Sequence, residues 1–222
     1  MMVQSLYTFI IKGGPLVWPI LGCSVLGVAI FFERLFYLWR IRRSESGILK
    51  TLESHFKAGD ILEFFKDLPE ATGPALNMIK EAAGICCDDS EALETVLDFH
   101  IDAEVEAASK YMDTLATLGA ISPLLGLLGT VTGLIKAFMV IEASGGKVNA
   151  SMLAGGIWEA MLTTAFGLAV ALLLIVGHRF LLSRVKHLED ELEHIAILLL
   201  KGAYHNRKAN GLGVSYEKTS LK

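Results

Sequence analysis

The sequence predicts an all-α membrane protein with three transmembrane helices. The second and third are expected to extend into the cytosol as long helices, with a helical cytosolic insert between spans one and two. Hydrophobic residues make up 53% of the 222 residues, and they gather in blocks. Three blocks are long enough to cross a bilayer, which takes about 20 residues at roughly 1.5 Å each. In two of them small residues recur on one stripe, as in helices that pack closely within lipid.

The first transmembrane helix is predicted at 13–35, after an N-terminal segment at 1–12 on the outer side. Its central part, 15–32, carries no charge and ends abruptly at Glu33-Arg34. A basic start and a small-residue cleavage site are both missing, so we expect a retained helix rather than a removed signal peptide. We interpret Arg34 as a topological stop whose charged head lies among lipid phosphates.

Residues 36–112 are predicted to form a cytosolic helical region, which Pro69 and the Gly73-Pro74 pair interrupt. Ser90 is expected to be the N-cap of a helix that leads toward the second span, with acidic residues in its first turn. The apolar residues that recur along this helix are Ala92, Val96, Phe99, Ala103 and Ala107.

The second transmembrane helix is predicted at 113–143 and the third at 153–178, joined by an outer turn at 144–152. The turn is too short for a folded domain, so the two helices should form an antiparallel hairpin. A cytosolic helix is expected at 179–203 and a flexible tail at 204–222. The cytosolic helix carries a heptad stripe, which packs against a neighbour in the same or another subunit: Leu181, Val185, Leu188, Leu192, Ile195 and Leu199.

The orientation follows from the basic residues beside the spans, because cytoplasmic flanks are richer in Lys and Arg. The outer side offers only Lys12 and Lys147. The N-terminus is therefore predicted outside and the C-terminus inside. The predicted inner flanks hold Arg34, Arg40, Arg42, Arg43, Arg179, Arg184 and Lys186.

Charge and motif content argue against several classes of function. A net charge of −4 gives no basic footprint for nucleic acid. No Cys/His cluster has the spacing of metal ligands, and no hydrolase, protease or nucleotide-binding fingerprint is present. Cys86 and Cys87 are interpreted as inert cytosolic thiols. We therefore expect no metal, no cofactor and no enzymatic activity.

Polar residues inside the hairpin are the main functional clue. Thr130 and Thr164 should lie about 18 Å and 16 Å below its outer end, with Thr163 close by. A hydroxyl can donate and accept, so hydroxyls at one depth can hold water or relay a proton. The alternative is that each hydroxyl bonds the carbonyl one turn earlier and merely packs. Three at one depth favour a polar, pore-lining path.

Lys136 and Glu159 are also predicted to lie at the same depth, each about 9 Å from the outer end of the hairpin. Either charge alone in hydrocarbon would cost about 3 kcal/mol. We hypothesise that the two form an ion pair, or that Glu159 lines a wet lumen while Lys136 snorkels outward. Helix packing is assigned to the small residues of the two stripes: Gly126, Gly129, Gly133, Gly155 and Gly167.

No aspartate or glutamate lies at mid-depth in any of the three apolar runs. A proton path needs a titratable group at that depth, and threonine cannot titrate there. If protons cross, the carboxylate that carries them must come from another chain.

Two segments resemble the second and third membrane helices of the MotA/TolQ/ExbB proton-channel family: SPLLGLLGTVTGLIKAF (122–138) and GGIWEAMLTTAFGLAVAL (155–172). The first-span segment GGPLVWPILGCSVLGVAIFFERL (13–35) is similar to ExbB-type members. By this resemblance, the threonine of the family's GTVxG motif falls on Thr130. The glutamate of GxxEA falls on Glu159, and the second functional threonine falls on Thr164.

The resemblance further implies a subunit of the bacterial inner membrane, with the outer segments in the periplasm. It implies a pentamer around an ExbD-like (or TolR-like) partner whose single membrane helix carries an aspartate. Proton flow would then drive a TonB-like protein for outer-membrane import. The alternatives are a TolQ-like subunit serving envelope integrity and, from another class, a non-conducting membrane scaffold. An intramembrane enzyme is disfavoured, because no nucleophile–base pair is visible.

Overall fold

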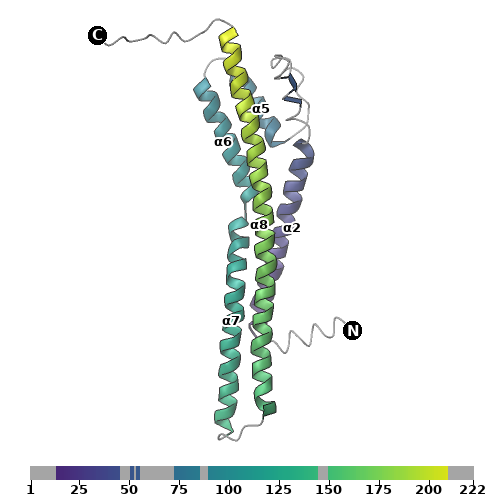
Figure 1. Cartoon of the computed structure of the whole chain (residues 1–222), viewed down its shortest axis with the longest axis vertical. Helices are drawn as coiled ribbons and strands as arrows, with labels where there is room; N and C mark the ends of the chain where they lie inside the picture. The colour runs from purple at the N-terminus through teal and green to yellow at the C-terminus, as the bar shows by residue number, and fades with distance from the viewer. Residues whose placement is uncertain are drawn as a thin grey trace, which may run out of the picture. The chain divides into compact units, whose positions relative to one another are not determined.

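A computed structural model describes residues 14–45, 51–52, 54–55, 73–85, 90–144 and 150–209. These residues are almost entirely helical and contain no strand, which confirms the predicted all-α fold class (Figure 1). The helices are α2 (Val17–Glu45), α5 (Pro74–Ile85), α6 (Ser90–Ser109), α7 (Met112–Ala143) and α8 (Ala150–Ala209).

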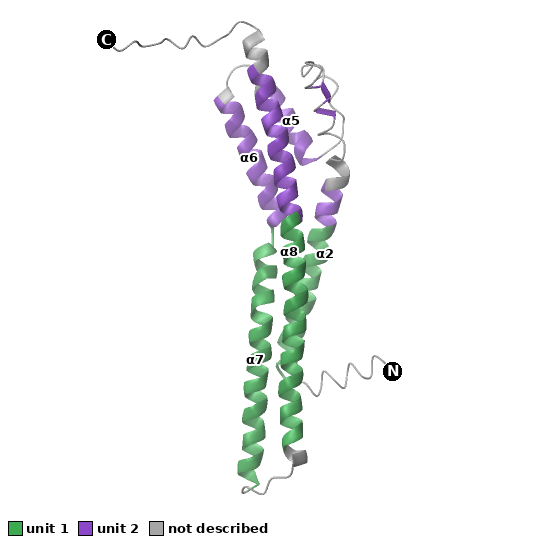
Figure 2. Ribbon diagram, viewed as in Figure 1, with its two compact units in different colours: residues 1–35, 110–183 green, residues 36–109, 184–222 purple. Residues whose placement is uncertain are grey.

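The chain divides into two compact units, and α2 and α8 contribute residues to both (Figure 2). Unit 1 comprises residues 1–35 and 110–183, and unit 2 comprises residues 36–109 and 184–222.

Three stretches of the described residues are long and apolar enough to cross a membrane: Val17–Ile41, Glu91–Ala143 and Leu153–Tyr204. The third is one unbroken helix, which continues to Ala209, beyond the end expected at residue 203. The second is interrupted, because Tyr111 has a left-handed backbone (φ 65°) that no right-handed helix can include. The helix before the second span is therefore α6, separate from α7.

Small residues hold unit 1 together. Bulky side chains would separate the helix axes, whereas glycine and alanine let two backbones approach. Ser122, Gly126 and Gly133 of α7 are buried, as are Ala160 and Gly167 of α8. The first helix joins α8 in the same way: a methyl group added at Gly27 would overlap Leu174, and one at Gly177 would lie 3.0 Å from Phe31 Cδ2.

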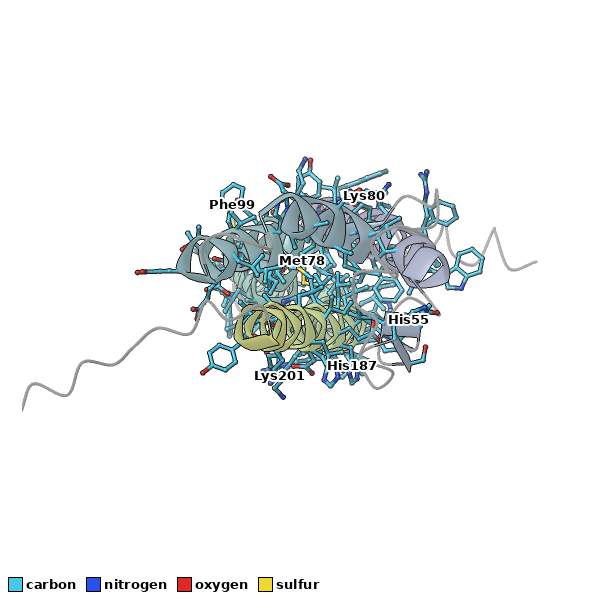
Figure 3. The ribbon with its side chains drawn as sticks, turned by 90° about the horizontal axis from the view of Figure 1, so that it is seen from above. His55, Met78, Lys80, Phe99, His187 and Lys201 are labelled. Carbon is cyan, nitrogen blue, oxygen red and sulfur yellow. The ribbon has the colours of Figure 1, made fainter. Side chains whose placement is uncertain are left out.

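Larger apolar side chains form the core of unit 2, where α5 and α6 pack together. The core-facing residues of these two helices are Leu76, Met78, Ile79, Leu93, Leu97 and Ile101. Seen along the bundle, Met78 points into the space between α5 and α8, whereas Phe99 and Lys201 point outward (Figure 3).

The apolar residues that recur along α6 are not the ones that face the core. Phe99 is 69% exposed, and Ala103 and Ala107 are exposed as well. The buried stripe is Leu93, Leu97 and Ile101, which recur at steps of four. Because leucine and isoleucine bury more apolar area than alanine, that stripe faces the core.

The six residues of the heptad stripe on α8 are all buried within this chain. This stripe was expected to pack against a neighbour, either within the subunit or between subunits. The buried side chains show that it packs within the subunit. The predictions for 1–12, for Cys86 and Cys87, for most of the turn at 144–152 and for 210–222 lie outside the described residues.

Candidate functional site

The candidate site lies along the contact between α7 and α8 in unit 1. At this contact, which we call the glycine seam, backbones almost touch. A methyl group added at Gly129 would lie 2.6 Å from Thr163 Cβ, and one at Gly167 would lie 2.6 Å from the Ser122 carbonyl oxygen. Real side-chain carbons do not approach so closely, so only glycine fits at these positions.

Four of the five glycines assigned to packing lie in this seam: Gly126, Gly129, Gly133 and Gly167. The fifth, Gly155, has no atom of this chain within 4 Å of an added methyl group. Gly156 takes its place, since a methyl group there would lie 3.0 Å from Ala137 Cβ. Successive residues on a helix point about 100° apart, so only one of the two glycines can face α7.

Thr164 makes a hydrogen bond that links the two helices. Its hydroxyl donates to the carbonyl oxygen of Gly126 at 2.8 Å, from α8 to α7. A methyl group at Gly126 would lie 3.1 Å from Thr164 Cα, so the bond depends on the bare glycine backbone. Thr130, on the next turn of α7, donates to the Leu127 carbonyl at 2.6 Å and is partly exposed.

Thr163 lies in the packed interior instead of on an open face. It is 1% exposed, and its hydroxyl donates to the Glu159 carbonyl at 2.5 Å. Its side chain fills the space that Gly129 leaves. The expectation that Thr163 lines a path together with Thr164 therefore does not match its position within this chain, because neighbouring helical residues diverge in direction.

Glu159 and Lys136 meet side by side. Lys136 Nζ lies 2.6 Å from Glu159 Oε1. The lysine side chain is 49% exposed and the glutamate 21%. Each charge offsets the other in a segment where an isolated charge is costly. Of the two arrangements considered from the sequence, the structure has the paired one.

The structure adds Gly14 to this pair. Gly14 has a left-handed backbone (φ 73°) just before α2, and a methyl group on it would overlap Glu159 Oε1 and lie 2.7 Å from Glu159 Cδ. Glu159 thus lies beside the N-terminal turn of α2, where the helix dipole favours an anion. The sequence signal was Gly13-Gly14-Pro15, a turn pattern directly before an apolar helix.

Arg34 is also placed differently from its interpretation as a stop among lipid phosphates. It is 5% exposed, and it binds Glu33 through two charge-assisted bonds of 2.6 and 2.7 Å. Its guanidinium lies 5.4 Å from the ring centroid of Tyr111. An exposed carboxylate and an aromatic face satisfy this buried cation within the chain. The adjacent Glu33 was visible in the sequence, whereas Tyr111 is far along the chain.

The described residues contain no group of three or more His, Cys, Asp or Glu side chains that could hold a metal ion. At the seam, the chain places one carboxylate with its lysine near hydroxyls that can donate and accept hydrogen bonds.

Comparison with known proteins agrees with this picture. The model of the MotA/TolQ/ExbB proton channel family matches residues 71–194. The biopolymer transport protein ExbB of Salmonella typhimurium is 33% identical over 80% of this chain and 77% of that protein. An ExbB homolog of Methanothermobacter thermautotrophicus is 27% identical over 84% of this chain and 65% of its own length.

The Tol-Pal system protein TolQ of Haemophilus influenzae is 35% identical over 43% of this chain and 41% of that protein. The family match covers more than half of the chain, including all of α7 and most of α8. It also includes the glycine seam, Lys136 and Glu159. This chain therefore belongs to the MotA/TolQ/ExbB proton channel family, and it is most like the ExbB members.

Proposed function

We propose that this chain conducts protons as one subunit of a motor that converts ion-motive force into mechanical work. The observation that carries the proposal is Glu159, a carboxylate held by Lys136 inside a helix apolar enough to span a membrane. Ionisable residues at such positions are costly and usually mark an ion path. Membership of the family and three apolar helices make the protein a multi-pass protein of the inner membrane.

In this proposal Glu159 and Lys136 form the outer entrance, and Thr130 and Thr164 line the deeper part of the path. Thr164 crosses the seam, while Thr130 is partly exposed on the adjacent turn. Hydroxyls can pass a proton along a hydrogen-bonded chain, but they do not store one. The group that holds the proton at mid-depth is the aspartate of an ExbD-like partner with a single membrane helix.

The assembly we propose is a homo-oligomer, a pentamer by family resemblance, that surrounds the partner helices. Proton flow moves the partner relative to the ring, and a TonB-like protein passes the work to outer-membrane import. Moving one charge through 100 mV releases about 2.3 kcal/mol, so several protons supply enough energy to rearrange a packed interface. The N-terminus lies in the periplasm and the C-terminus in the cytoplasm.

The test is Thr164→Val, which keeps the shape and removes the hydroxyl. Thr117→Val is the matched control, because the Thr117 hydroxyl is exposed and donates only to its own helix, to the Asp113 carbonyl at 2.7 Å. Both variants are reconstituted with the co-expressed partner in liposomes, and proton uptake is followed with a pH-sensitive dye under an imposed potential.

We expect Thr164→Val to assemble and to lose proton flux by about tenfold or more, as is typical when a proton-transfer group is removed. Thr117→Val should conduct like the parent. A non-conducting scaffold predicts equal, background flux in all three proteins, and that result would refute the channel.

A TolQ-like role in envelope integrity is the second candidate, favoured by the similarity to the Haemophilus influenzae protein. The two roles share the channel and differ in the partner. Co-purification of the chain with ExbD-like or with TolR-like partners distinguishes them.

A further inference from the structure

The turn before the first helix contacts the carboxylate of Glu159. Gly14 contacts Oε1 of Glu159, the same oxygen that lies 2.6 Å from Lys136 Nζ. Three parts of unit 1 thus meet at one atom: α8 carries the glutamate, α7 supplies the lysine, and the turn before α2 supplies bare backbone.

This turn is anchored. The Gly14 carbonyl accepts a hydrogen bond from the Val17 amide at 3.3 Å, which closes the turn into α2. Val17 and Ile20, on the first turn of the helix, are each 1% exposed. Because these two side chains hold the start of α2 in place, the backbone of Gly14 forms a fixed wall beside the carboxylate.

Only glycine can form this wall. A left-handed backbone disfavours residues with a Cβ, and a Cβ at this site would occupy the position of Glu159 Oε1. The atom displaced would be the end of a flexible side chain, so the chain can still fold while the carboxylate moves away.

We propose that Gly14 is a positioning residue for Glu159: it holds the carboxylate against Lys136 and so sets the geometry of the outer entrance. The first helix is then part of the proton path through its N-terminal turn. This inference rests on the proposed function for its consequence in conduction, but the positioning can be tested without any conduction.

The experiment compares Gly14→Ala with Gly22→Ala. Gly22 lies in α2, the helix that follows this turn, and a methyl group added there meets nothing within 4 Å. A carbodiimide joins a carboxylate directly to an amine with loss of water, so the yield of the Lys136–Glu159 cross-link, measured by mass spectrometry, reports their contact. Proton flux is measured on the same preparations with the partner present.

We expect Gly14→Ala to lower the cross-link yield about fivefold, the population ratio that a modest ion pair supports, and to lower proton flux. Gly22→Ala should change neither. An unchanged yield in Gly14→Ala overturns the positioning, and a lowered yield with normal flux overturns its importance for conduction. If the parent itself conducts no protons, the proposed function fails while the cross-link still decides the contact.

A double-mutant cycle with Glu159→Ala separates the effect of backbone strain at Gly14 from the effect of its contact with Glu159. If Gly14 and Glu159 are in contact, Gly14→Ala lowers the melting temperature more in the parent than in the Glu159→Ala background. Equal losses in the two backgrounds mean that strain alone acts, and they contradict the proposal.

Discussion

Glu159 is defined by its neighbours rather than by its position in the sequence. Its carboxylate is paired with Lys136 at 2.6 Å and touches the backbone of Gly14. In a medium of low dielectric constant, removing one member of an ion pair leaves a charge that nothing compensates, whereas removing both is milder. This asymmetry makes the pair testable by stability alone.

Lys136→Met should destabilise the protein by about 1–2 kcal/mol, because it leaves Glu159 without its counter-charge. Adding Glu159→Gln should recover most of this loss. The free energy of unfolding is compared for the parent, the single and the double variant in the same detergent. A double variant less stable than Lys136→Met would mean that the pair has no such coupling.

Sequence reasoning found the residues of the pair but not all of their surroundings. Helical rise alone put Lys136 and Glu159 at one level, because both lie on regular helices that share one short turn. It could not find Gly14, since contacts between distant segments depend on how α2 packs. Thr163 and Thr164 looked equivalent as a run, and only the observed helix phase separates the buried residue from the one that crosses the seam.

The glycine seam is the feature that organises unit 1 at the level of elements. Gly126, Gly129 and Gly133 of α7 face Gly156, Ala160 and Gly167 of α8. In lipid there is little hydrophobic drive between helices, so close packing and interhelical hydrogen bonds must supply the attraction. Added volume in the seam should therefore cost stability directly.

Gly129→Ala should destabilise the protein by about 1–3 kcal/mol, because its methyl group would overlap Thr163. Gly155→Ala adds the same methyl group to α8, where it meets no atom within 4 Å. It should leave stability unchanged or raise it slightly, since alanine favours a helix. Thermal unfolding of both variants measures the difference, and equal effects would contradict the seam.

The elements themselves were largely predictable from periodicity. Small residues at steps of three and four identified the seam, and the heptad stripe on α8 is buried as its spacing suggested. The break at Tyr111 carries no glycine or proline signal, so nothing in the local sequence marks it. Two apolar stripes run along α6 with a helical period, and side-chain size decides which of them faces the core.

The stability of the whole chain should depend on pH through a carboxylate of α6, the helix before the second span. Burial raises the pKa of Glu104 in α6, partly opposed by the positive charge that His100 can carry. Nε2 of His100 also contacts Glu81 of α5. A raised pKa means that the folded state binds this proton more readily than the unfolded state does.

Glu104→Gln should therefore raise the melting temperature of the full chain at neutral pH, where the parent keeps a charged, partly buried carboxylate. The difference in melting temperature between Glu104→Gln and the parent narrows as the pH falls through the raised pKa of Glu104. It vanishes below the ordinary pKa of 4.5, because the carboxyl group is then protonated in both the folded and the unfolded state. Glu106→Gln, at an exposed position of the same helix, controls for the loss of one charge. A parent that is more stable than Glu104→Gln at neutral pH would contradict the assignment.

The hydrogen bond from Thr164 to Gly126 has a mechanical consequence. Glycine has no rotamers to exchange, and a backbone carbonyl cannot swing away from its helix, so α7 and α8 have no easy way to slide past each other. If the chain works in the assembly proposed above, α7 and α8 should move together as one rigid unit, and any sliding should take place where this unit contacts other chains.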